Sequence, residues 1–140
     1  MTPSRKQSLP YQNPDRLSDV MALIQVLALH TYADRTENGL QTDLQGPPRS
    51  ASQWKEIASQ HPEFFRVNES REHAVALVAR HVLPRNEDGD RQLESDFVER
   101  LLNTAIELHD RQLDRLRYWK VYIPIIVAMT PASLLCLVFY

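Results

Sequence analysis

The last twenty residues of the chain, 121–140, contain no charged side chain. They read VYIPIIVAMTPASLLCLVFY, and a helix needs about 20 predominantly apolar residues to cross the hydrocarbon core of a membrane. A surface helix would be apolar along one stripe only, whereas this run is apolar on all sides. The alternative is a buried C-terminal helix of a soluble protein. The sequence therefore predicts a transmembrane helix over 121–140.

The residues that flank this run predict its orientation. One pair of aromatic residues precedes it and a second pair ends it, and such amphipathic rings prefer the headgroup level of a membrane. Basic side chains flank only the N-terminal end, which the positive-inside bias places in the cytoplasm. We expect a single-pass membrane protein with a cytoplasmic N-terminal domain. The expected membrane-interface residues are Arg115, Arg117, Tyr118, Trp119 and Lys120.

The rest of the chain has room for one small domain. Prolines, polar clusters and apolar periodicity divide it further. The predicted segments are 1–14 for a flexible N-terminal arm, 15–83 for the domain, 84–91 for a polar linker and 92–120 for an amphipathic juxtamembrane helix. Basic and acidic residues are interspersed and the net charge is -2, so the chain lacks the strongly positive balance of a nucleic-acid binder.

Within the domain, apolar periodicity predicts three helices. The first covers 15–32 and is apolar on most sides, so it must be largely buried. Asn38-Gly39 indicates a turn, and 40–44 fits a short second helix. The third helix ends at His61, because a residue before proline is pushed out of the helical region. A short segment of aromatic and polar residues follows the third helix.

That segment predicts a β-hairpin. Its first strand covers 64–67 and its second covers 73–82, with a polar turn between them. We expect Trp54, Phe64 and Phe65 to be largely buried between helix and hairpin. Because neighbours along a strand alternate faces, only one of the two phenylalanines is expected to point inward.

The order helix, short helix, helix and hairpin resembles that of a winged-helix domain. The resemblance covers about 15–82 and is carried by 54–58 (WKEIA), 61–67 (HPEFFRV) and the alternating strand 73–79. It implies that the proline stops the third helix, that the aromatic residues fill the core beneath the sheet, and that the polar loop is the wing. The implied fold is mainly α with a small β-hairpin, an α+β class, followed by the long amphipathic helix and the transmembrane helix.

The charges depart from those of DNA-binding winged helices, which carry arginine and lysine on the third helix and the wing. Here the helix and the wing mix carboxylates, amides and few cations, and a carboxylate repels phosphate. The residues concerned are Gln53, Lys55, Glu56, Ser59 and Gln60 on the helix and Glu69, Arg71 and Glu72 on the wing. A protein-binding use of the domain, without sequence-specific binding of duplex DNA, is therefore expected.

The amphipathic helix carries an apolar seam that alternates in steps of four and three residues. Its upper half can pack on the protein's own domain, whereas its lower half, from His109 on, lies close above the predicted membrane. Two prolines in the membrane run, Pro124 and Pro131, free backbone carbonyls that lipid cannot satisfy. We therefore expect this helix to bind a partner. The predicted partner-binding residues are Leu102, Ile106, His109, Leu113 and Leu116.

No pattern of catalytic or metal-binding residues stands out. The five histidines are scattered without the spacing of metal ligands, and the three glycines form no phosphate-binding loop. The single cysteine, Cys136, lies in the apolar run, so the chain itself offers no disulfide and no thiolate metal site. We expect a non-catalytic protein without cofactor or metal.

Three functions fit these observations. The first is a membrane-anchored accessory or adaptor subunit whose domain and anchor pack against partner proteins of a membrane complex. The alternative is a membrane-tethered winged-helix transcriptional regulator, which basic residues clustered on one face of the domain would favour. The third is a homo-oligomer formed through the seam of the amphipathic helix.

Overall fold

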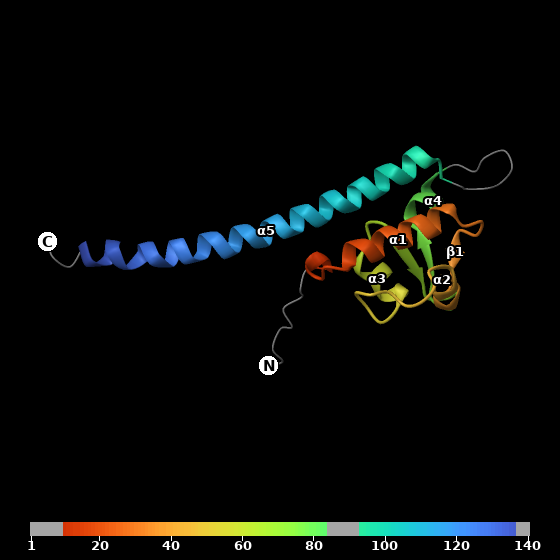
Figure 1. The fold of residues 1–140 in the computed structure, drawn as a ribbon, viewed down its shortest axis with the longest axis horizontal. Coiled ribbons are helices and arrows are strands. Elements are labelled where there is room, and N and C mark those ends of the chain that lie inside the picture. Colours follow the sequence, from red (N-terminus) through yellow and green to blue (C-terminus); the bar gives the residue numbers. More distant parts are fainter. Residues whose placement is uncertain (1–9, 84–92, 137–140) are drawn as a thin grey trace.

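The structure is a computed structural model that describes residues 10–83 and 93–136, with side chains described as far as Tyr118. It is mainly helical and contains one small antiparallel sheet, an α+β arrangement (Figure 1). The elements in chain order are η1 (Pro10–Gln12), α1 (Arg16–Leu29), β1 (Asp34–Arg35), α2 (Glu37–Asp43), α3 (Trp54–Gln60), β2 (Phe65–Asn68), β3 (Ala74–Leu77), α4 (Val78–Val82) and α5 (Ser95–Cys136).

The sheet has three strands in the order β1-β3-β2, so the last strand in sequence is the central one. In the hairpin, Phe65 lies opposite Leu77 and Asn68 opposite Ala74. On the other side of β3, Asp34 pairs with Ala76. All four residues of β3 are buried.

The core lies between α1, α3, the sheet and the first half of α5. Helix α1 contributes five apolar residues with almost no exposed surface: Val20, Leu23, Ile24, Leu27 and Ala28. The predicted burial of Trp54, Phe64 and Phe65 is confirmed, since each is 3% exposed. The indole nitrogen of Trp54 donates a hydrogen bond to the Gly46 carbonyl oxygen at 2.9 Å, which satisfies its polar atom inside the core.

The expectation that only one of the two phenylalanines points inward is wrong. Strand β2 begins at Phe65, so Phe64 lies in the turn before the strand, where face alternation does not apply. The amides of both residues donate to the His61 carbonyl oxygen, at 3.1 Å for Phe64 and 3.0 Å for Phe65. This turn at the end of α3 directs both rings into the core.

The predicted second strand 73–82 is wrong beyond Leu77, where the chain becomes helix α4. At that point the Val78 amide donates to the Phe64 carbonyl oxygen at 2.9 Å, and the sheet pairing ends. The sequence pattern does not show the change, because valine and alanine fit either a short strand or a short buried helix.

Asn38-Gly39 does not form the predicted turn but lies in the first turn of α2. Thr36 caps this helix, since its hydroxyl oxygen accepts a hydrogen bond from the Gly39 amide at 3.3 Å. A Cβ atom at Gly39 would lie 2.9 Å from the Arg35 guanidinium carbon, so the glycine leaves room for that side chain. Strand β1, which contains Arg35, was not predicted from the sequence.

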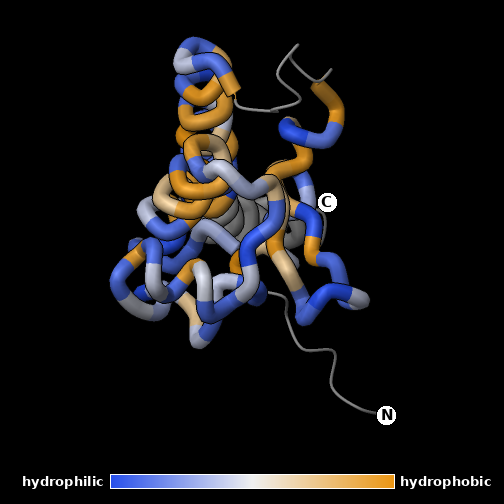
Figure 2. The backbone as a smooth tube through the Cα atoms, turned by 90° about the vertical axis from the view of Figure 1, so that its right-hand side faces the viewer, coloured by the Kyte–Doolittle hydropathy of each residue, from blue (hydrophilic) through white to orange (hydrophobic). Residues whose placement is uncertain are grey.

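Helix α5 contains 42 residues and is the longest element. Its first half runs alongside α1, and its second half extends away from the domain, so the C-terminal end lies far from the sheet (Figure 1). Hydrophobic and hydrophilic residues alternate around its first turns (Figure 2). Among the residues whose side chains are described, no helix is long and apolar enough to cross a membrane. The side chains of the predicted transmembrane segment 121–140 and the predicted linker 84–91 lie outside the described residues.

Candidate interaction surface

The face of α5 that meets the domain is a stripe with spacings of three, four and three residues: Val98, Leu101, Ala105 and Leu108. Ala105 has no exposed surface and Val98 is 8% exposed. One turn further, the Gln112 side-chain oxygen accepts a hydrogen bond from the Tyr11 amide at 3.4 Å. The domain therefore covers α5 as far as Gln112.

The five predicted partner-binding residues form a second stripe, one position further along the helix and thus about 100° around it. Leu102 and Leu116 are half-buried, whereas Ile106 and Leu113 are 37% and 39% exposed. Only 17% of the His109 side chain is exposed, because its ring packs at right angles on the Tyr11 ring, 5.6 Å away between centroids. Of these five residues, Ile106 and Leu113 are exposed, whereas Leu102 packs against the core and His109 against Tyr11. We call this second stripe the open stripe.

This result differs from the predicted division of the seam at His109. His109 is covered by the domain, whereas Ile106, in the half expected to pack on the domain, is exposed. The cause is the segment η1, which the sequence assigns to the flexible arm 1–14. Tyr11 of η1 is 1% exposed and extends the domain down the helix.

Beside the open stripe, a groove of about 510 Å³ runs between α1 and α5. Its floor and α1 wall are formed mostly by apolar or small side chains, and His109 supplies the α5 wall. The lining residues are Pro14, Leu17, Ser18, Met21, Ala22, Gln25 and His109. The groove and the exposed Ile106 and Leu113 together form the open side of the α1–α5 pair, which we call the α1–α5 face.

Tyr11 joins three elements at the lower edge of this face. Its ring lies 4.7 Å from the His61 ring and contacts the His109 ring on α5. Burial, with a smaller contribution from the negative charge of Glu63, raises the pKa of the Tyr11 hydroxyl, which therefore stays neutral. Among the described residues, three buried polar atoms lack a hydrogen-bond partner: Tyr11 Oη, Arg16 Nε and His61 Nε2.

Glu63 pairs with His61 at the end of α3. A Glu63 carboxylate oxygen lies 2.9 Å from His61 Nδ1. Burial by itself raises the pKa of Glu63, but the hydrogen bond and the charge of His61, with a backbone hydrogen bond, outweigh burial and leave this pKa below its usual value. The pair fixes the imidazole against Tyr11 and so supports the contact with α5.

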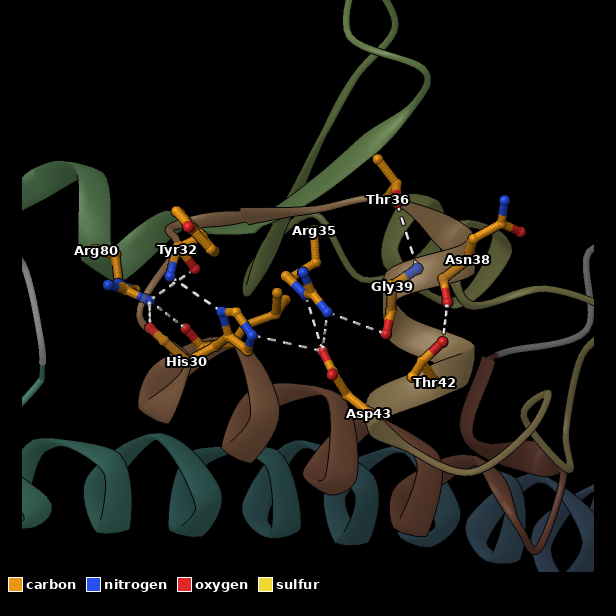
Figure 3. A network of polar contacts seen from close by, with 10 residues as sticks. His30, Tyr32, Arg35, Thr36, Asn38, Gly39, Thr42, Asp43 and Arg80 are labelled. Atoms are coloured by element: carbon orange, nitrogen blue, oxygen red, sulfur yellow. Dashed lines mark hydrogen bonds and ion pairs between the residues drawn. The ribbon is translucent and has the colours of Figure 1, made fainter.

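The far end of α1 is held by Arg80 of α4, a side chain that is 1% exposed (Figure 3). Its guanidinium donates to the carbonyl oxygens of Leu27 at 2.9 Å, His30 at 2.6 Å and Tyr32 at 3.1 Å. The last carbonyls of a helix have no partner within the helix, and a cation also interacts favourably with that end of its dipole. We interpret this network as structural, because it satisfies the backbone that links α1 to β1.

An ion pair in the same view joins β1 to α2. Arg35 lies 2.6 Å from an Asp43 carboxylate oxygen, and His30 lies 3.9 Å from the same atom. A similar buried contact anchors the loop before α3, where the Asp19 carboxylate accepts hydrogen bonds from the Ser50 amide at 2.7 Å and hydroxyl at 2.6 Å. These polar contacts all connect elements of the domain to one another.

The start of α3 is already occupied by the protein's own carboxylate. Glu37 accepts hydrogen bonds from the Trp54 amide at 2.9 Å and the Lys55 amide at 3.0 Å. Such amides are the groups that would bind a phosphate at a helix start. On the hairpin turn, Arg71 lies 3.6 Å from the Asp34 carboxylate. The predicted absence of duplex binding stays a prediction, and these contacts favour it.

The predicted membrane-interface residues lie where α5 leaves the domain. Arg115 and Arg117 are exposed, and Tyr118 is 62% exposed. The side chains of Trp119 and Lys120 lie outside the described residues. Among the described side chains there is no group of three or more histidine, cysteine, aspartate or glutamate residues that could hold a metal ion.

The chain was compared with protein-family models, with curated proteins and with solved structures. No family model matches it, and neither comparison of proteins finds a match.

Proposed function

We propose that this protein is a non-catalytic, membrane-anchored adaptor whose small domain is held at a membrane surface and binds protein through the α1–α5 face. Helix α5 connects the domain to the proposed anchor. The first half of α5 is part of the domain core, and the uncharged run 121–140 follows in the same chain. Because the backbone is helical from Ser95 to Cys136, any fixation of the run also fixes the domain.

We further propose that the domain is a winged-helix variant. Its element order, α1-β1-α2-α3-β2-β3 with the sheet order β1-β3-β2, supports this assignment. Helix α3 would take the place of the recognition helix, and the turn between β2 and β3 would take the place of the wing.

The observation that carries the proposal is the open stripe of α5. Ile106 and Leu113 are large apolar side chains left partly in water, next to a groove between two helices. Apolar surface removed from water contributes about 25 cal/mol per Å². An adaptor that uses this face would bury these side chains on binding.

The competing function, a tethered transcriptional regulator, would use α3 and the hairpin turn. In this chain Glu37 occupies the start of α3, and acidic side chains surround the few cations there. A gel-shift assay of the protein at physiological salt separates the two functions. We expect no sequence-selective shift, and a shift at submicromolar protein would favour the regulator.

Membrane anchoring is tested by alkaline carbonate extraction of the full chain, with a variant that ends at Lys120 as the matched control. We expect the full chain to stay in the membrane pellet, because an apolar helix across the bilayer is not released by high pH. The shortened variant should be found in the supernatant. Release of the full chain by carbonate would show that the run 121–140 is not a membrane anchor.

A further inference from the structure

We propose that the α1–α5 face binds a second copy of this chain, with the two α5 helices side by side and parallel. The parallel direction rests on the proposed function, since two copies anchored in the same membrane enter it in the same direction. The contact itself rests on the surface of α5, as follows.

The first argument is the spacing of the open stripe. The five predicted residues, Leu102, Ile106, His109, Leu113 and Leu116, alternate in steps of four and three, which is the a/d pattern of a coiled coil. Leu102 packs against the domain core and His109 against Tyr11, so the exposed members are Ile106 and Leu113. Ile106 and Leu113 then occupy a positions, and Leu102 and Leu116 occupy d positions. In a parallel pair each layer meets its own counterpart, and a β-branched residue at a with leucine at d favours two strands.

The second argument is the position of the domain. Ala105 has no exposed surface and Ile106 is 37% exposed, although the two are neighbours in the chain. A second helix lying along Ile106 and Leu113 therefore leaves the domain-facing stripe in place. The contact would begin beside the domain at Ile106 and continue to Leu116, past Gln112, which is the last residue of α5 with a described hydrogen bond to the domain.

The residues that flank the stripe, at the e and g positions of the heptad, are compatible with a second copy as the partner. The edge at e positions carries Asp110 and Arg117, one heptad apart and of opposite sign, and the edge at g positions carries Ala105 and Gln112. In a parallel pair, Gln112 would face Arg117 of the other copy, while Ala105, which has no exposed surface, stays against its own domain, so no like charges meet. A foreign helix would need its own complementary pattern of charges to match these edges, whereas a second copy of this helix fits without like charges meeting.

Of the five layers, the open ones carry the contact. His109 is already in contact with Tyr11, and its Nδ1 lies 3.0 Å from an Asp110 carboxylate oxygen. The contact between copies therefore depends chiefly on Ile106 and Leu113, with Leu116 below them. The groove beside His109 gives the second helix room to approach α1.

Disulfide cross-linking of the full chain in membranes tests the proposal. In a Cys136→Ser background, Ile106→Cys and Leu113→Cys place single thiols on the open stripe, and Arg111→Cys places one on the exposed back of the helix. A disulfide needs Cβ atoms about 4 Å apart, so only facing positions react under mild oxidation. We expect a band at twice the chain mass for both stripe variants and its loss in Arg111→Cys.

The two stripe positions also report direction. They lie seven residues apart, or about 10 Å along the helix. An antiparallel pair brings a residue close to its own counterpart only near the two-fold axis. Self-linking at both positions therefore requires parallel helices, and self-linking at one position only would overturn the parallel arrangement.

Other outcomes are equally decisive. Equal bands from all three variants would indicate random collision, and adducts of another mass without a dimer band would indicate a different protein on this face; either result overturns the proposal. No dimer band from chains that resist carbonate extraction would overturn self-pairing and leave the membrane anchor intact. Dimer bands from chains that carbonate releases would support self-pairing and remove the anchor.

Discussion

The two halves of α5 differ in what surrounds them. From Ser95 to Gln112 the helix belongs to the domain, and its stripe of Val98, Leu101, Ala105 and Leu108 is part of the core. Beyond Gln112 the same helix leaves the domain, with Leu113 39% exposed. Within the first length the difference is between faces, since Ala105 has no exposed surface and Ile106 beside it is 37% exposed.

The largest expected effect concerns the domain side of this comparison. Phe65→Ala removes a ring that is 3% exposed, and truncating a buried aromatic residue costs about 3–5 kcal/mol of unfolding free energy. Denaturant unfolding of the full chain in detergent, followed by circular dichroism, measures the loss. Arg115→Ala on the exposed part of α5 is the control, which we expect to stay within about 0.5 kcal/mol. A loss from Arg115→Ala as large as that from Phe65→Ala would show that α5 beyond Gln112 contributes to domain stability as a core residue does.

A smaller effect is expected from two neighbouring positions within the first half. Ala105→Leu adds bulk where Ala105 has no exposed surface, and overpacking costs about 1–3 kcal/mol. Thr104→Leu adds an apolar side chain at the adjacent exposed position and should change the unfolding free energy by less than about 0.5 kcal/mol. The same unfolding measurement applies. A loss at Thr104 as large as that at Ala105 would show that α5 packs on the domain through another face.

The smallest effect is a dependence of the unfolding free energy on pH, which arises from the Glu63–His61 pair beside Tyr11. The pKa of Glu63 lies below its usual value when the protein is folded, so its contribution to stability is present above about pH 4.3, the usual value of a glutamate, and is lost as the pH falls through the lowered pKa. Unfolding free energies measured from pH 6 down to the acid range should fall more steeply for the natural chain than for Glu63→Gln. Parallel curves for the two proteins would contradict this assignment.

The sequence predicted much of the domain because its core residues are also local signals. Trp54 opens a helix, Pro62 follows the residue that ends it, and the two phenylalanines come directly after, so burial and element boundaries point the same way. Strand β1 was missed because it contains only Asp34 and Arg35, and pairing with β3 rather than any local pattern makes it a strand. No window of two polar residues can show that.

For the candidate surface, the sequence showed the spacing of Leu102, Ile106, His109, Leu113 and Leu116. It did not show which of these side chains the domain covers. Helical periodicity shows which residues share a face, and it does not show where on that face another element lies. That coverage depends on Tyr11, which is 101 residues away in the chain from Gln112, its hydrogen-bond partner on α5. A tyrosine between two prolines in a polar segment gives no sign of that long-range contact.

The unbroken backbone of α5 has a geometric consequence for the proposed membrane anchoring. Gln112 and Val121 are nine positions apart, so a helix of about 1.5 Å rise per residue holds the last domain contact about 14 Å from the start of the apolar run. Each residue also turns the helix by about 100°. The number of residues between Gln112 and the apolar run therefore sets the rotation of the domain about the helix axis as well as its distance from the run. A chain with one residue more or fewer in this interval would present a different side of its domain to every neighbour in the same membrane.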